Sequence, residues 1–301
     1  KNPAALNDSY IQIVYEARDE TLWLGTTKRG LAKFDRAAGT FTFYDHQPEN
    51  PQSLSHNDVN GIGEDNNGGF WVATANGLNK FDRATGRVTR YASNPKNPNG
   101  LSDNRILALL VDQTGQVWLG TENGLNKFEP TSEHFTRYQN DRRNPQSLDS
   151  NAVRSIYQTK SGVLWIGTAS GLNRYAPETN GFTVYQHAPA NPRSLGEGPV
   201  NAILEGTNDQ LWVGTLIGGL DKYNQKTAHF RQFKHDDQNP NSISDDNVFS
   251  MLEDRHQNLW IAPISGGIIR YFHEQQRFEA VRGNFGFINS FYEDRAGRIW
   301  I

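Results

Sequence analysis

The sequence predicts an all-β protein, specifically a β-propeller with seven blades of four antiparallel strands each. Three observations predict this fold. The dipeptide Asn-Pro recurs at intervals of 47 or 48 residues, beginning at positions 2, 50, 97, 144, 191 and 239, and one further copy begins at 94. All seven tryptophans fall at one place in this repeat, at 23, 71, 118, 165, 212, 260 and 300. Each repeat also holds four short strand-like segments, and none shows the 3.6-residue period of a helix.

Each repeat reads as four strands that are separated by turns. The first strand is DVNGIGED at 58–65, with equivalents at 105–112 and 247–254. A turn rich in Asn, Asp and Gly leads to the second strand, which reads LWLGT, VWLGT, LWIGT or LWVGT. A short loop precedes the third strand, LNKFE at 125–129 or LNRYA at 172–176. The fourth strand carries spaced aromatic residues, as in FTRY at 135–138.

A four-stranded sheet of this size cannot bury both of its faces alone. Radial stacking lets each sheet bury its faces between two neighbours, which is the architecture of a propeller. We expect the first strand to be innermost, where the ring is narrowest, because a small residue recurs at one of its positions. The residues at that position are Gly61, Ala108, Ser155, Ala202 and Ser250. The tryptophans and the fourth-strand aromatics would fill the wider space further out.

The repeat divides the chain into six complete blades and a partial seventh, within one domain over 1–301. The predicted blades cover 1–49, 50–96, 97–143, 144–190, 191–238, 239–284 and 285–301. Ile301 corresponds to Leu24 of the first repeat, which continues to Glu49, so roughly 25 residues (49 − 24) would complete the seventh blade. A six-bladed ring with an additional hairpin is the alternative, but an unpaired apolar hairpin invites aggregation.

The composition excludes several classes of function. The net charge is −3, from 30 basic and 33 acidic residues, whereas proteins that bind nucleic acid or membrane surfaces usually have a basic excess. The chain has no cysteine, so disulfides and thiol chemistry are excluded. No stretch of 18 apolar residues is present that could span a bilayer. The chain begins at Lys1 without an initiator Met, so we expect a removed leader or a longer parent protein.

The pattern EDxxGxLWIGTxxGLNKFD, followed by FxxY and NPxSLS, resembles the two-component regulator propeller repeat. The resemblance covers essentially the whole chain, because the pattern recurs in register. It implies the extracytoplasmic sensor region of a membrane-bound bacterial sensor kinase, often a hybrid kinase, or of a diguanylate cyclase. Such a region would be a non-enzymatic, periplasmic, ligand-sensing or dimerising ectodomain, and we expect a homodimer in the parent protein. Glycan-derived ligands are common in this family.

Ligand recognition is expected where the repeats differ, at the mouth of the channel. The first residue of the innermost strand differs in every repeat, and the residue two positions further on is also variable. Polar groups mixed with a few aromatic rings suit a small polar ligand. The predicted ligand-binding residues are Tyr10, Asp58, Asn60, Arg105, Arg154, Asn201, Asn247 and Phe287.

The loops between the second and third strands form another variable surface. LIGG at 216–219 and ISGG at 264–267 are longer and more apolar than their equivalents. Ile217 and Ile264 would together form a protein contact patch if both are exposed.

Two other functions fit the same fold. One is a protein-interaction scaffold without a small ligand. The other is a propeller lyase resembling the streptogramin lyases, which needs a His with a carboxylate partner, or a metal, at the channel mouth. The predicted mouth positions hold no His and one carboxylate, Asp58, and the eight histidines form no H-x-H or H-x₃-H pair. We therefore expect no catalytic residue, metal site or cofactor, and no nucleic-acid partner or membrane contact.

Overall fold

The computed structural model describes residues 6, 10–283 and 285–301, which form β-strands and one three-residue 3₁₀ helix, η1 (Thr207–Asp209). The described strands make six four-stranded sheets and one two-stranded sheet, in which each strand pairs with its neighbours in the sequence. The ladders are antiparallel, so these sheets are the blades of a β-propeller, and the partial last sheet agrees with the predicted partial seventh blade. The chain divides into two compact units, 1–139 with 151–153, and 140–150 with 154–301. The expected single domain stays a prediction.

The first unit holds blades 1 to 3. Blade 1 consists of β1 (Ile11–Glu16), β2 (Leu22–Thr26), β3 (Leu31–Asp35) and β4 (Thr40–Tyr44). Blade 2 consists of β5 (Val59–Glu64), β6 (Phe70–Thr74), β7 (Gly77–Phe81) and β8 (Val88–Tyr91). Blade 3 consists of β9 (Ile106–Val111), β10 (Val117–Thr121), β11 (Gly124–Glu129) and β12 (His134–Tyr138).

The second unit holds blades 4 to 6, apart from the first residue of β13, and the two-stranded sheet. Blade 4 consists of β13 (Val153–Gln158), β14 (Leu164–Thr168), β15 (Leu172–Ala176) and β16 (Gly181–Tyr185). Blade 5 consists of β17 (Val200–Gly206), β18 (Gln210–Thr215), β19 (Gly219–Asn224) and β20 (His229–Phe233). Blade 6 consists of β21 (Val248–Glu253), β22 (Leu259–Pro263), β23 (Ile269–Phe272) and β24 (Arg277–Ala280). The last sheet pairs β25 (Tyr292–Glu293) with β26 (Ile299–Trp300).

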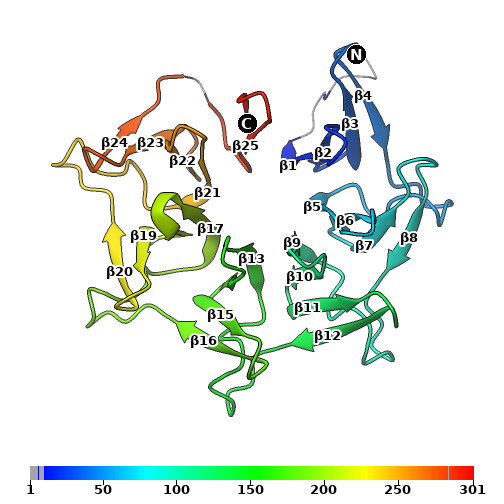
Figure 1. Cartoon of the computed structure of the whole chain (residues 1–301), viewed down its shortest axis with the longest axis horizontal. Coiled ribbons are helices and arrows are strands. Elements are labelled where there is room, and N and C mark those ends of the chain that lie inside the picture. Colours follow the sequence, from blue (N-terminus) through cyan, green and yellow to red (C-terminus); the bar gives the residue numbers. More distant parts are fainter. Residues whose placement is uncertain (1–5, 7–9, 284) are drawn as a thin grey trace. The chain divides into compact units, whose positions relative to one another are not determined.

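Within each unit, consecutive blades pack face to face and are closest at their first strands. β5 lies against both β1 and β9 in the first unit, and β17 lies against β21 in the second, as Figure 1 shows. The small residue predicted for this strand has a steric cause. A Cβ atom at Gly61 would lie 2.6 Å from the Cβ of Leu109 on β9, so a side chain would force the two strands apart. The prediction that small residues mark the closely packed first strand is confirmed.

The tryptophans lie in the hydrophobic layers between blades. Trp71 is buried, and its ring centroid lies 5.1 Å from that of Phe128 in the next blade, in an edge-to-face arrangement. Trp212 and Tyr271 repeat this contact between blades 5 and 6 at 5.3 Å. Such aromatic pairs contribute about 0.5–1.5 kcal/mol beyond the burial of their area. One tryptophan per repeat is therefore a packing requirement of each interface.

The repeated NPxSL segments connect the blades and cover their outer edges. The leucine of each connector is buried, as Leu54 and Leu148 show at 1% and 0% exposure. The backbone carbonyl of Gln52 also accepts a hydrogen bond of 2.9 Å from Val88 on β8, so the connector pairs with an outer strand that would otherwise be open. The first Asn-Pro pair, at residues 2 and 3, lies outside the described residues.

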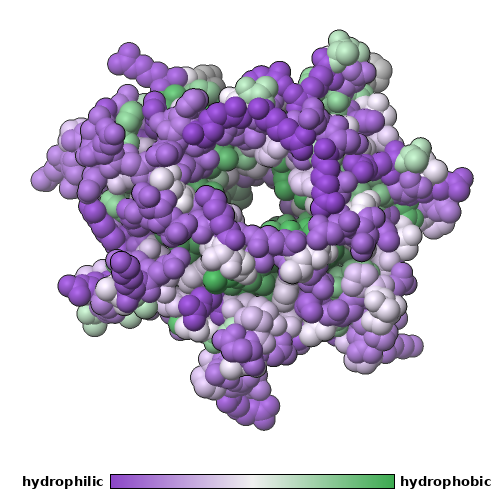
Figure 2. Space-filling model, viewed as in Figure 1, coloured by the Kyte–Doolittle hydropathy of each residue, from purple (hydrophilic) through white to green (hydrophobic). Residues whose placement is uncertain are grey.

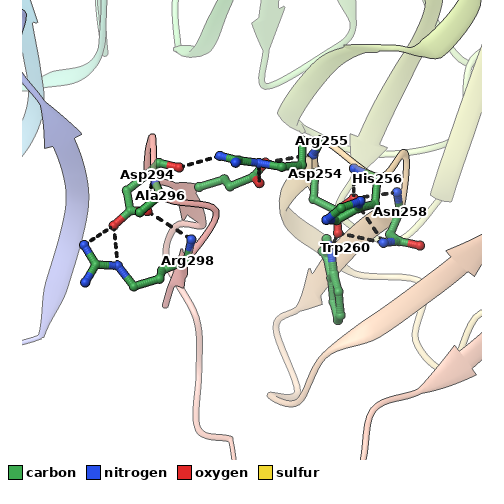
Figure 3. A network of polar contacts seen from close by, with 9 residues as sticks. Asp254, Arg255, His256, Asn258, Trp260, Asp294, Ala296 and Arg298 are labelled. Carbon is green, nitrogen blue, oxygen red and sulfur yellow. Dashed lines mark hydrogen bonds and ion pairs between the residues drawn. The ribbon is translucent and has the colours of Figure 1, made fainter.

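An aspartate holds the turn between the first and second strands and binds the tryptophan that follows. In blade 2, Asp65 Oδ1 accepts the backbone N–H groups of Asn67 and Gly69, and Asp65 Oδ2 accepts the indole N–H of Trp71 over 2.7 Å. Figure 3 shows the equivalent bond from Trp260 to Asp254, which measures 2.8 Å. Burial alone would raise the pKa of Asp254, but the bonds from Asn258, Trp260 and the backbone hold it below its usual range.

Blades 1, 4 and 5 lack this aspartate. Ala17, Thr159 and Gly206 occupy its position, six residues before Trp23, Trp165 and Trp212. The indole nitrogens of Trp23 and Trp212 are buried, and neither has a hydrogen-bond partner among the described residues. The repeat therefore departs from its own pattern in three blades, and in blades 1 and 5 the departure leaves a buried indole nitrogen without a partner among the described residues.

Candidate ligand-binding face

The residues that begin the first strands are structurally equivalent. In each case the backbone carbonyl accepts a hydrogen bond from the residue that follows the second strand. The pairs are Tyr10 with Thr27 (3.0 Å), Asp58 with Ala75 (2.9 Å), Arg105 with Glu122 (3.4 Å), Pro199 with Leu216 (2.9 Å) and Asn247 with Ile264 (3.0 Å). The two variable surfaces, strand starts and loops, therefore lie at the same end of each blade.

In the first unit these residues differ in the exposure of their side chains and in the partners that the side chains bind. Tyr10 is 67% exposed, and Arg105 is exposed with its Nη1 3.5 Å from the Glu122 carboxylate. Asp58 is half-buried and accepts a bond of 3.4 Å from the side chain of Gln12. Asn60 donates its side-chain amide to the carbonyl of Ile106 at 2.9 Å, so this amide links blade 2 to blade 3.

The second unit presents an unpaired amide and an aromatic pair. The side-chain oxygen of Asn201, on β17, is buried and has no hydrogen-bond partner among the described residues. On the neighbouring blade Asn247 donates its side-chain amide to Asp245 at 2.8 Å. Phe287 is 43% exposed and packs edge-to-face on Phe249, with ring centroids 4.8 Å apart. Arg154 is exposed. That these residues bind a ligand stays a prediction.

The loop between β18 and β19 holds an isoleucine in an unusual conformation. Ile217 has a φ of 91°, which is strained for a β-branched residue, and it is 58% exposed. The connector packs tightly against this loop, because a Cβ atom at Gly198 would lie 1.7 Å from the carbonyl oxygen of Leu216. Ile264, in the equivalent loop of blade 6, is 43% exposed. Strain of this kind persists only where the surrounding structure enforces it, and it often marks functional loops.

A buried polar cluster supports the corresponding loop of blade 2, and blade 5 alters its chemistry. In blade 2, Asn79 accepts the N–H of Ser55 at 2.9 Å and donates to the Ser55 hydroxyl, which contacts Thr74 at 2.8 Å. In blade 5, Asp221 replaces the asparagine and Gly196 replaces the serine. Burial raises the pKa of Asp221 to about 7, and one of its oxygens has no partner among the described residues.

Sequence analysis did not single out Asp221, although the change from GLN to GLD at 219–221 was visible. The remaining chemistry of this face consists of hydrogen bonding and apolar contact. Figure 2 shows hydrophilic residues over most of the visible face, with isolated hydrophobic ones between them. Among the described residues, no three His, Cys, Asp or Glu side chains are grouped so that they could hold a metal ion. No helix in the described part of the chain is long and apolar enough to cross a membrane.

Solved structures share this fold at low sequence identity. The extracellular domain of a putative one-component system from B. thetaiotaomicron has a TM-score of 0.59 and 20% identity, over 93% of this chain and 44% of its own. The chain thus spans less than half the length of that relative. Virginiamycin B lyase from Staphylococcus aureus has a TM-score of 0.69 and 14% identity, over 96% of this chain and 90% of its own. No curated protein sequence matches the chain.

The sequence pattern of the two-component regulator propeller matches residues 53–76, 100–123 and 147–170. Each match starts at the residue before the buried leucine of a connector, passes through the first strand and ends just beyond the second strand. These are the elements whose packing and hydrogen bonds recur from blade to blade. The chain therefore carries the two-component regulator propeller repeat in these three segments.

Proposed function

We propose that this chain is the sensory propeller of a membrane-bound bacterial signalling protein and that it acts outside the cytoplasm, in the periplasm. The repeat supports this role, and so does the fold shared with the extracellular domain of a putative one-component system. The chain corresponds to 44% of that domain, so transmission of the signal depends on parts of the parent protein beyond these residues.

The ligand that we propose is a small polar molecule, such as a glycan fragment, bound where the first strands begin. One observation carries this proposal, namely the buried and unpartnered side-chain oxygen of Asn201 in the blade next to the exposed ring of Phe287, which packs on the partly buried Phe249. A buried acceptor without a partner costs about 1–3 kcal/mol, and a ligand hydroxyl would recover this cost. Exposed ring faces suit the C–H surface of a sugar, and amides suit its hydroxyl groups.

Signalling would follow from a shift between arrangements of paired ectodomains. A ligand that binds one arrangement of a homodimer more tightly than the other shifts the population toward it. Ile217 and Ile264 are candidates for the contact between partners, because both are exposed at the ends of neighbouring blades. Replacing both with Ser should weaken self-association in analytical ultracentrifugation, and an unchanged association constant would remove them from the interface.

Isothermal titration of the protein against an oligosaccharide panel tests the ligand site. Phe287→Ala and Asn201→Ala should each weaken binding by about tenfold, whereas Asn201→Ala should not lower the thermal midpoint because it removes an unsatisfied oxygen. Arg143→Ala is the matched control, since its side chain is 91% exposed on a connector. Equal affinities for all four proteins would reject this site, and binding by no panel member would favour the scaffold function.

A lyase activity is the second candidate, because the fold is shared with virginiamycin B lyase. Mass spectrometry of the titration mixtures detects it directly, since a lyase would convert the ligand into product. Unchanged ligand after prolonged incubation would support the sensory function.

A further inference from the structure

Glutamates at the ends of first strands bind the turn of the preceding blade. Glu64 Oε2 accepts the backbone N–H of Arg18 over 3.0 Å, which joins blade 2 to blade 1. Glu253 Oε1 accepts the backbone N–H of Thr207 over 2.7 Å, which joins blade 6 to blade 5. In both interfaces the preceding blade lacks the aspartate for its tryptophan, as blade 4 does where Glu205 of blade 5 accepts the backbone N–H of Lys160 over 2.6 Å. The two sites are therefore closely matched, and each lies within one unit.

The matched sites differ in the cation that faces the glutamate. In blade 2, Arg83 Nη2 lies 3.0 Å from Glu64 Oε1. His273 occupies the equivalent position in blade 6, two residues after Tyr271 as Arg83 is two residues after Phe81. His273 Nε2 lies 3.4 Å from Glu253 Oε2. Both atoms are buried, and neither forms a hydrogen bond with any described residue.

We propose that Glu253 and His273 form a proton-controlled latch that ties the β17–β18 turn of blade 5 to blade 6. When His273 is protonated, it pairs with the carboxylate and fixes the oxygen that receives the N–H of Thr207. When His273 is neutral, the pair loses its charge attraction and the turn is held less firmly. An arginine stays charged at every physiological pH, whereas an unperturbed imidazole changes charge near pH 6.5. Blade 6 thus carries a switchable version of the permanent contact in blade 2.

The surroundings of the latch are closely packed. The rings of Trp212 and Tyr271 flank His273, with centroids 6.1 and 5.1 Å from the imidazole. The space that an aspartate would need is already taken, because a Cβ atom at Gly206 would lie 2.4 Å from Glu253 Oε2 and 3.1 Å from Trp212 Nε1. The carboxylate of Glu253 therefore lies in the space that an aspartate side chain at position 206 would occupy.

Other charged and titratable groups lie around the pair. Lys222 on β19 lines the same pocket as His273, and Arg231 on β20 reaches Gln276 of the β23–β24 loop at 3.1 Å. Burial raises the pKa of Tyr157 on β13, and the charge of Glu253 adds to this rise. Glu274 follows His273 in the chain. The pocket has a volume of about 220 Å³, and Thr207 and Gln257 lie on its wall, so the latch also shapes a cavity.

Hydrogen exchange of the backbone, followed by mass spectrometry at pH 5.5 and 7.5, tests the latch. After correction for intrinsic rates, the amides of 207–210 in the wild type should exchange up to about fivefold more slowly at pH 5.5. The equivalent amides at 18–21 should exchange at the same corrected rate at both pH values, because Arg83 stays charged. All proteins in this experiment carry Asp221→Asn, so that titration of the buried acid in blade 5 does not contribute to the pH dependence of exchange.

Two substitutions move the response in opposite directions. His273→Arg introduces the residue found in blade 2 and should give the slow rate at both pH values. Arg83→His should create the same pH ratio at 18–21. The latch is refuted if 207–210 show equal protection at both pH values, or if His273→Arg keeps the pH ratio. A thermal midpoint for each variant shows whether it is folded before its exchange is interpreted.

Discussion

The backbone N–H of Gly196 donates a hydrogen bond of 3.1 Å to Asp221 Oδ2, in the place where Asn79 of blade 2 holds Ser55. A neutral amide can donate and accept at this position, whereas a carboxylate can only accept. The other oxygen of Asp221 is buried without a partner among the described residues. Blade 5 thus keeps the geometry of the repeat but carries an acid in a site built for an amide.

Replacing Asp221 with Asn should stabilise the protein in alkaline solution. Burial raises the pKa of Asp221 to about 7, so the folded state keeps a proton that the unfolded state has lost. A raised pKa means that the contribution of Asp221 to stability is full below about pH 3.8 and is lost as the pH rises through about 7. Asp221→Asn should therefore add roughly 2–4 kcal/mol at pH 8 and little at pH 4 in denaturant unfolding.

The reverse substitution in blade 2 is the control for this prediction. Asn79→Asp should introduce a buried acid and make the stability of the protein fall between pH 5 and pH 8. If Asp221→Asn unfolds at a lower denaturant concentration than the wild type at pH 8, burial of the charge is not the dominant effect.

Removing the acceptor of a buried indole should destabilise blade 2. Asp65→Ala leaves the Trp71 N–H without its 2.7 Å bond and also releases the turn, at a cost of about 2–3 kcal/mol. Asp65→Asn keeps one acceptor oxygen and should cost less. Thermal unfolding of both variants tests this order, and equal midpoints for Asp65→Ala and the wild type would contradict it.

A methyl group at Gly198 should disturb the loop that carries Ile217. The residue has a φ of 97°, and an added Cβ atom would lie 1.7 Å from the carbonyl oxygen of Leu216. Gly198→Ala should therefore lower stability by more than 3 kcal/mol, about the cost of strain and overpacking together. Gly68→Ala is the control, because Gly68 also has a positive φ of 81° but no atom within 4 Å of the added Cβ. It should cost only about 1 kcal/mol, as measured by denaturant unfolding.

The NPxSL segment has two roles, since its leucine fills the space between blades and its proline fixes the turn. Substitutions at Leu54 and Pro51 should separate them. Leu54 is 1% exposed, so Leu54→Ala should cost about 2–5 kcal/mol by opening a cavity between blades. Pro51→Ala in the same segment changes an exposed residue and should cost less than about 1 kcal/mol. Denaturant midpoints that fall equally for both variants would show that the turn, and not the buried leucine, carries the stability.

Much of the fold could be predicted because each structural role occurs many times. Seven tryptophans in register predicted the repeating blade, and the buried rings of Trp71 and Trp212 confirm their packing role. The small residue on the first strand indicated close strand approach, which Gly61 and Leu109 show. The variable residues at the strand starts were found by their disagreement with the repeat, and their ligand-binding role stays a prediction.

Periodicity by itself determined the class of fold, the number of repeats and the residues that pack between blades, since a role that recurs every 47 or 48 residues reveals itself by repetition. Only the tertiary structure decided which polar atoms meet across blades. Glu253 and Thr207 are 46 residues apart in the chain, and His273 lies in the turn after β23 whereas Glu253 ends β21 of the same blade. In the sequence each reads as an ordinary charged or polar residue, because burial, distance and the lack of a partner are properties of packed neighbours and not of position in a repeat.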